Sequence, residues 1–124
     1  SEKLSIVKRI LLAEDKSMNQ KLAVDILQKD GYILDVVDDG QQAFEKTISG
    51  GYNAILMDVQ MPMLDGIKAM EMIRKLDSNV PIIIITAFYL ADEMERSYSA
   101  GCSDYIVKPM RKEDLLNKIY RYFD

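Results

Sequence analysis

Polar side chains that could do chemistry follow four of the apolar runs in this chain. Glu14 and Asp15 follow the first run, Asp58 the third, Thr86 the fourth and Lys108 the fifth. An unpaired carboxylate at the tip of a buried strand costs free energy, so such an Asp either pairs with a cation or takes part in a reaction. We expect Asp58 to do both.

The acidic residues among these predict a metal site. Three clustered carboxylates repel one another unless a cation neutralises them. A cleft of oxygen ligands suits a hard ion, and Mg²⁺ is the usual ion where phosphate is handled. We predict a Mg²⁺ ion held directly by Asp15 and Asp58, through water by Glu14, and by a backbone carbonyl near Gln60.

The same set of residues predicts phosphoryl transfer. Asp58 would attack a phosphoryl group and form an acyl phosphate. Lys108 and the metal would neutralise the oxygens of a loose transition state, and Thr86 would donate a hydrogen bond to the bound group. A lone Asp after a strand more often caps a helix or turn, and a Thr often ends a strand through its β-propensity. The structural interpretation would need four such coincidences, one at each of four strand ends in chain order. We therefore favour the chemical interpretation.

The elements that position these residues follow from the hydrophobic pattern. Strands are expected at Val7–Ala13, Ile33–Val37, Ala54–Met57, Pro81–Thr86 and Tyr105–Val107. Helices are expected between them and after the last. This strand–helix alternation with short connections predicts an α/β domain over residues 1–124, with a doubly wound (βα)5 parallel sheet covered on both faces. Ligands of such sheets bind at the carboxyl ends of the strands.

Two details of the predicted helices can be checked directly. Ser17 and Gln20 have the spacing of a capping box at the start of the first helix, and Asp65 is expected to cap the third. The buried face of the first helix is predicted from residues at helical spacing. These are Met18, Leu22, Ile26 and Leu27.

Composition excludes several functions. The net charge of −4 disfavours direct nucleic-acid binding, and the absence of histidine excludes a catalytic triad or a phosphohistidine within this chain. No apolar segment approaches the ~20 residues of a membrane span, so we expect no membrane contact. One cysteine and an N-terminus without a signal-peptide pattern predict a cytoplasmic location.

Four motifs resemble the receiver domains of two-component response regulators, and they span nearly the whole chain. They are Leu11–Asp15, Met57–Gly66, Ile85–Ala87 and Tyr105–Pro109. The resemblance implies a flavodoxin-like receiver fold with strand order 2-1-3-4-5 and a cis Lys108–Pro109 peptide bond. It also implies Mg²⁺-dependent phosphoryl transfer from a histidine on a partner to Asp58. Such a domain is not an enzyme beyond catalysing its own phosphorylation and dephosphorylation.

The resemblance further implies a conformational switch. Thr86 moves toward the phosphoryl group, and Tyr105 then rotates inward into the space that Thr86 leaves. This rotation remodels the face formed by helix 90–100, strand 105–107 and the last helix. A second copy of the chain is one expected partner, in a homodimer that forms through this face on phosphorylation.

Two motifs resemble most closely the receivers of hybrid sensor histidine kinases. They are Ala-Glu-Asp with Asn19–Gln20 downstream, and Asp-Val-Gln-Met-Pro-Met. This resemblance implies that the partner is a histidine kinase or a histidine phosphotransfer domain. It also implies that the chain could be one domain of a longer kinase; because the chain ends after the last helix, no output domain is expected within it.

Three other functions could use a similar α/β fold. A phosphatase or phosphotransferase with an Asp nucleophile needs a second acid two residues later, where this chain has Gln60. A flavin-binding module needs a phosphate loop after the first strand, where Glu14 and Asp15 would repel phosphate. A pseudo-receiver that binds partners without being phosphorylated is the alternative that stays open, although this chain keeps the full set of acids and the lysine.

Overall fold

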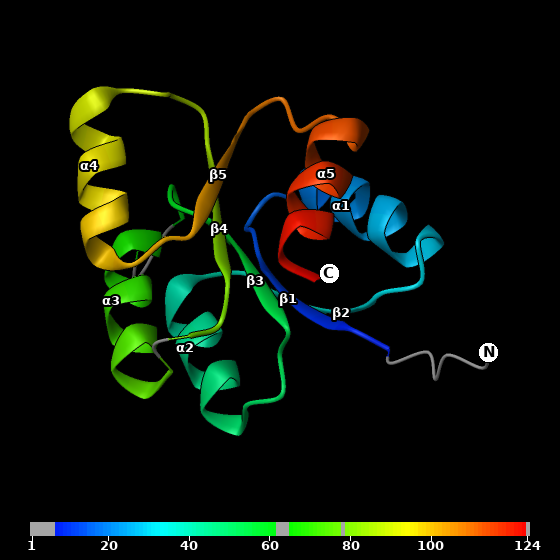
Figure 1. Cartoon of the computed structure of the whole chain (residues 1–124), viewed down its shortest axis with the longest axis horizontal. Coiled ribbons are helices and arrows are strands. Elements are labelled where there is room, and N and C mark those ends of the chain that lie inside the picture. The colour runs from blue at the N-terminus through cyan, green and yellow to red at the C-terminus, as the bar shows by residue number, and fades with distance from the viewer. Residues whose placement is uncertain (1–6, 62–64, 78, 124) are drawn as a thin grey trace.

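The structure is a computed structural model that describes residues 7–61, 65–77 and 79–123 of the chain. Strands and helices alternate five times, as predicted (Figure 1). The elements are β1 (Arg9–Ala13), α1 (Ser17–Lys29), β2 (Ile33–Val37), α2 (Gly40–Ser49), β3 (Ala54–Asp58), α3 (Gly66–Leu76), β4 (Ile82–Thr86), α4 (Ala91–Ala100), β5 (Asp104–Val107) and α5 (Lys112–Phe123).

All neighbouring strands pair in parallel, in the order β2-β1-β3-β4-β5. This order confirms the one implied by the receiver resemblance. In the pairing of β3 with β4, Asp58 lies beside Ile85, and in the pairing of β4 with β5, Thr86 lies beside Val107. The last residues of these strands therefore lie at one edge of the sheet, together with the end of β1.

Helices cover both faces of the sheet, with α1 and α5 on one face and α2, α3 and α4 on the other (Figure 1). Every residue of β3 and β4 is buried, as expected of central parallel strands. Alternate residues of β1 and β3 enter the two cores, so that Leu11 and Ile55 pack against α2 and α3 while Leu12 and Leu56 pack against α1 and α5. Among the described residues, no helix combines the length and apolar composition needed to cross a membrane.

The predicted buried face of α1 is wrong in part. Leu27 is fully buried and Ile26 partly so, but Met18 is 83% exposed and Leu22 43% exposed. The reason is geometric, because the fully buried residues of α1 are Ala23 and Leu27. Met18 lies five residues before Ala23, which is about 140° around the helix, and so points away from the sheet.

The predicted Ser17–Gln20 capping box is also wrong. Lys16 occupies the N-cap position without a side-chain bond, and Ser17 is the first residue within the helix. The Gln20 side-chain amide instead donates to the backbone carbonyl of Glu14 and to Asp38 Oδ1, so it ties together the ends of β1 and β2. The predicted cap of α3 is confirmed, since Asp65 Oδ1 accepts from the Lys68 backbone N–H at 2.9 Å.

Candidate functional site

Three carboxylates meet where β1 and β3 end. One oxygen from each of Glu14, Asp15 and Asp58 lies within 4.8 Å of the other two. Glu14 is 1% exposed and Asp58 is 0% exposed, whereas Asp15 is partly exposed. We call this cluster of three carboxylates the acidic cleft; Asp15 is its most exposed member.

The electrostatics of this cleft favour a bound cation. Glu14 Oε1 and Asp15 Oδ1 are buried and have no hydrogen-bond partner among the described residues. Burial, together with the neighbouring Asp58 carboxylate, raises the pKa of Glu14 to about 7, although the Lys16 backbone N–H on Glu14 Oε2 opposes the shift. Unpaired buried oxygens are costly, and they are the ligand type that Mg²⁺ prefers. The donor set thus fits this ion.

Both oxygens of Asp58 are held by neighbouring groups. Lys108 Nζ donates to Oδ2 at 3.0 Å, and the Gln60 backbone N–H donates to Oδ1 at 2.9 Å. Lys108 is itself fixed by its backbone N–H, which donates to the Thr86 carbonyl at 2.8 Å. The Lys108–Pro109 peptide bond is cis, as the resemblance implied. The role of the Gln60 carbonyl as a metal ligand stays a prediction.

Thr86 is buried at the end of β4, but its hydroxyl is bonded to the segment that follows. Thr86 Oγ1 donates to the Phe88 carbonyl at 3.0 Å and accepts from the Phe88 N–H at 3.2 Å. To donate to a phosphoryl group on Asp58, the hydroxyl would have to give up its bond to the Phe88 carbonyl, because it has a single proton. The predicted contact with a phosphoryl group therefore belongs to a second conformation.

Tyr105 lies half-buried in β5, beside Ile84 of β4. Its ring packs against the Tyr89 ring, with 5.0 Å between centroids. The nitrogen of Lys118 lies 4.6 Å from the Tyr105 ring centroid. The predicted inward rotation of Tyr105 would break both contacts.

Gly66 brings the first turn of α3 against the end of β3. A Cβ atom at Gly66 would lie 2.5 Å from the Asp58 carbonyl oxygen and 2.7 Å from Val59 Cα. These are backbone atoms, which cannot move aside as a flexible side chain would. Only glycine lets α3 approach the end of β3 this closely. Apart from the motif itself, the surrounding sequence does not indicate this role.

We expect Gly66→Ala to lower the free energy of unfolding by about 2 kcal/mol, because the added methyl group overpacks the end of β3. It should also slow any reaction at Asp58, because the carboxylate is displaced. Urea unfolding measures the first effect. Gly31→Ala is the control: Gly31 has φ of +93° and a Cβ there meets nothing, so strain lowers stability without disturbing Asp58. Equal reactivity of the two variants would contradict this role of Gly66.

We expect Glu14→Gln to stabilise the metal-free protein by about 1 kcal/mol at pH 8, because it removes one charge from a cluster of like charges. The affinity for Mg²⁺ should fall at least tenfold, because the bound ion would no longer have the negative charge of Glu14 beside it. Urea unfolding in EDTA and calorimetric Mg²⁺ titration measure the two effects. Glu71→Gln, at an exposed position of α3, should change neither. A less stable metal-free Glu14→Gln would argue against charge repulsion in the cleft.

The fold and the acidic cleft together define the class of protein. The chain belongs to the response regulator receiver domain family, whose model matches residues 10–120. It is 37% identical over 123 residues to hybrid signal transduction histidine kinase I of Dictyostelium discoideum, an alignment that covers 92% of the chain. It is 36% identical over 115 residues to the signal transduction histidine-protein kinase BarA of Escherichia coli K12, covering 91%. The chain spans only 7% and 12% of these two kinases.

Solved structures agree with this family. The receiver domain of the Pseudomonas aeruginosa sensor histidine kinase PA1611, described with a magnesium ion in its active site cleft, is 37% identical with a TM-score of 0.88, over 94% of this chain and 98% of that one. The co-crystal structure of Saccharomyces cerevisiae Ypd1, a histidine phosphotransfer protein, with the Ssk1 receiver domain contains a match at 28% identity and a TM-score of 0.89. This match covers 97% of this chain and 91% of that one. The predicted family and fold are thereby confirmed.

Proposed function

We propose that this chain is the phosphoacceptor of a phosphorelay and takes a phosphoryl group from a phosphohistidine on a partner onto Asp58. One observation carries the proposal. Asp58 is a fully buried carboxylate, held by Lys108 and Gln60, in a cleft where other carboxylates keep unpaired oxygens. A purely structural role would leave this arrangement costly and without purpose.

In the proposed reaction, an Asp58 carboxylate oxygen attacks phosphorus. The new P–O bond forms as the P–N bond to the partner's imidazole breaks, and the bonding electron pair stays on the imidazole nitrogen. The Lys108 ammonium lies next to the attacking carboxylate and neutralises charge on the phosphoryl oxygens. Thr86 gives up its donated bond to the Phe88 carbonyl and donates its hydroxyl to the transferred group.

Mg²⁺ would be held directly by Asp15 and Asp58, through water by Glu14, and by the Gln60 carbonyl. The unpaired oxygens of Glu14 and Asp15 support this assignment. When bound, the ion supplies positive charge to the phosphoryl oxygens. The magnesium described in the PA1611 receiver domain supports the same choice of ion.

The proposed phosphodonor is a histidine kinase or a histidine phosphotransfer domain in the cytoplasm. The similarity to hybrid kinases and to a receiver crystallised with Ypd1 supports this class of partner. Residues 1–124 would form a single receiver domain, which could be part of a longer kinase. The single, buried Cys102 fits a reducing compartment.

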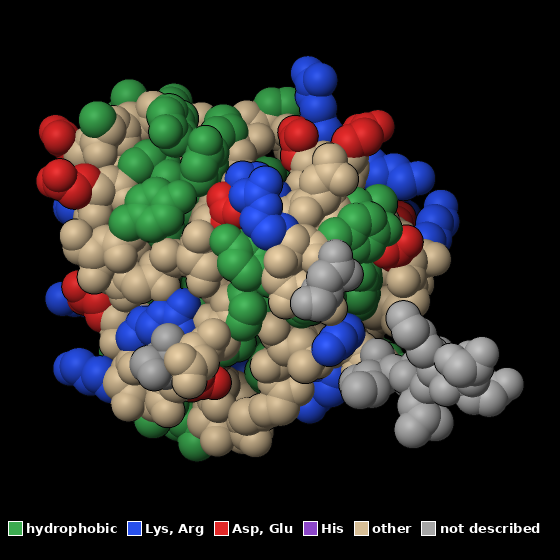
Figure 2. Space-filling model, in the orientation of Figure 1, with side chains coloured by type: hydrophobic (Ala, Val, Ile, Leu, Met, Phe, Trp, Pro, Cys, Tyr) green, Lys and Arg blue, Asp and Glu red, His purple; other side chains and the backbone are tan. Residues whose placement is uncertain are grey.

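The proposed output is a change in the face formed by α4, β5 and α5. Hydrophobic side chains gather over α4 and the segment before it (Figure 2), and Phe88, Tyr89 and Leu90 are exposed there. Because this segment is bonded through Phe88 to Thr86, movement of Thr86 would reach it directly. A homodimer formed on phosphorylation would use this face.

The test is the intact mass of the protein after incubation with acetyl phosphate. We expect the mass of one phosphoryl group to be gained with Mg²⁺ and none with EDTA, and borohydride reduction followed by peptide mapping to locate it at Asp58. No gain with acetyl phosphate, and none with a phosphorylated histidine phosphotransfer protein, would favour the pseudo-receiver alternative. The cleft would then be at most a metal site.

A further inference from the structure

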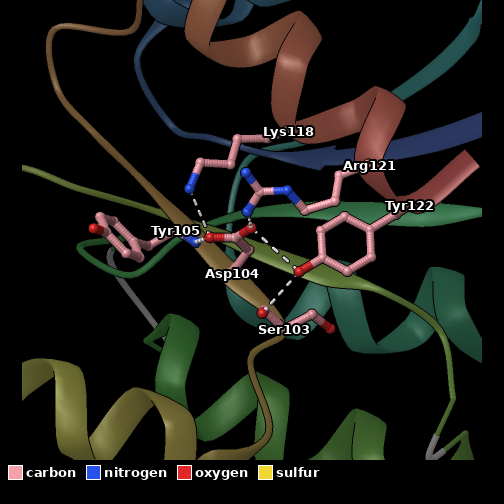
Figure 3. Close-up of polar contacts among 6 residues, drawn as sticks. All are labelled: Ser103, Asp104, Tyr105, Lys118, Arg121 and Tyr122. Atoms are coloured by element: carbon pink, nitrogen blue, oxygen red, sulfur yellow. Dashed lines mark hydrogen bonds and ion pairs between the residues drawn. The ribbon is translucent and has the colours of Figure 1, made fainter.

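A buried carboxylate outside the acidic cleft lies at the start of β5. Asp104, the first residue of β5, is almost fully buried, and three side chains of α5 converge on it (Figure 3). Lys118 Nζ lies 2.7 Å from Oδ1, Arg121 Nη1 lies 2.9 Å from Oδ2, and the Tyr122 hydroxyl donates to Oδ2 at 3.2 Å. These bonds hold α5 against β5.

Asp104 is an ionised anchor at neutral pH. Burial on its own raises the pKa of Asp104, but the bonds from Lys118, the Tyr105 backbone N–H and Tyr122 outweigh burial and leave the pKa below its usual value. The carboxylate is therefore charged over the neutral range. The Lys118 ammonium bonded to it is held in one place.

Lys118 has a second contact that Arg121 lacks in this structure. Its Nζ, the atom bonded to Asp104 Oδ1, also lies 4.6 Å from the centroid of the Tyr105 ring. A cation over a tyrosine ring is attracted to the electron-rich face of that ring. The ring also lies against the Tyr89 ring, with 5.0 Å between centroids, and a tilted aromatic pair is favourable. On its inner side Tyr105 packs against the hydrophobic core. Lys118 and Tyr89 thus both stabilise the Tyr105 ring in its present position.

We propose that Lys118 is a positioning residue that holds Tyr105 against Tyr89 and thereby opposes its inward rotation. The inference rests on the proposed function and on the switch that the receiver resemblance implies, in which Tyr105 turns inward when Asp58 carries a phosphoryl group. When a ligand binds only one of two conformations, its apparent dissociation constant is the intrinsic one divided by the fraction of protein in that conformation. Removing the Lys118 contact should therefore tighten the binding of any ligand that favours the inward conformation.

The experiment is a titration with beryllofluoride, a phosphoryl mimic, in the presence of Mg²⁺. We expect Lys118→Met to bind it about threefold more tightly than the wild type, an estimate from the strength of a half-exposed cation–ring contact. Lys118→Arg keeps a cation and should bind like the wild type. Arg121→Met is the matched control, because it also removes one bond to Asp104 but no ring contact, and it should leave the affinity unchanged.

A spectroscopic readout separates this role from general stabilisation of α5. In the free protein the ε-methylene protons of Lys118 should show an upfield ring-current shift, which should disappear when beryllofluoride binds and Tyr105 leaves. In a Tyr105→Leu background, Lys118→Met should no longer alter the affinity. Thermal unfolding of each variant verifies that it is folded, and Lys118→Gln serves as a second neutral variant.

The outcomes distinguish the two proposals. Failure of the wild type to bind beryllofluoride would refute phosphoryl acceptance at Asp58, and the role of Lys118 would fall with it. Binding by the wild type with no difference between Lys118→Met and the wild type would overturn the role of Lys118 alone. An equal gain in Lys118→Met and Arg121→Met would also overturn it, because the effect would then come from Asp104 and not from the ring contact.

Discussion

Replacement of Asp58 with Asn is expected to abolish phosphoryl uptake from acetyl phosphate and Mg²⁺, the largest effect expected of any substitution in this chain. The amide of Asn has nearly the shape of the carboxylate and can still accept the Gln60 N–H that now bonds to Oδ1. It carries no negative charge, however, and is a far poorer nucleophile toward phosphorus. The measurement is the intact mass after incubation, compared with the wild type.

Asp65→Asn is the matched control for this variant. Asp65 is an exposed carboxylate seven residues further along the chain, where it caps α3. Because Asn caps helices as well as Asp does, this variant should fold normally and gain one phosphoryl group. Uptake by Asp58→Asn at the wild-type level would mean that a different residue accepts the group.

Replacement of Lys108 with Met is expected to slow phosphorylation about a hundredfold, the usual scale for losing one group that stabilises charge in a transition state. Lys108 is the lysine bonded to Asp58 in the described part of the chain, and Met keeps most of its length without the charge. The initial rate of mass gain with saturating acetyl phosphate measures the effect.

The same variant should also lose stability in EDTA, by about 2 kcal/mol, because a buried carboxylate loses its cation. Mg²⁺ should restore part of this loss, since the ion supplies positive charge to the same cleft. Lys112→Met, at the exposed start of α5, should alter neither the rate nor the stability. A Lys108→Met rate within a factor of two of the wild type would remove Lys108 from the reaction.

The sequence predicted the sheet and the convergence of the acidic residues for one physical reason. The carboxyl ends of parallel strands meet at one edge, so Glu14, Asp15 and Asp58 could be placed together once the strands were located. The structure agrees on all these placements. What the residues do there stays a proposal that the experiments above test.

Contacts between distant segments could not be predicted in the same way. Gln20 fits a local capping pattern, yet its amide bonds to Asp38, which follows β2, and a local rule cannot anticipate this. Asp104 and its partners on α5 were missed, because the first of them lies 14 residues further along the chain. A usable signal existed, since Lys118 and Arg121 stand three residues apart on one helix face, but many surface helices have this spacing.

The position of β5 at the border of the sheet has a consequence for hydrogen exchange. β5 pairs with β4 alone, whereas β1, β3 and β4 are each paired on both sides. Amide protons of β1 and β3 should therefore exchange with solvent most slowly, at rates set by global unfolding, and those of β5 should exchange faster through local opening. The strand that carries Tyr105 can thus open and close repeatedly while the strands that carry the acidic cleft stay paired.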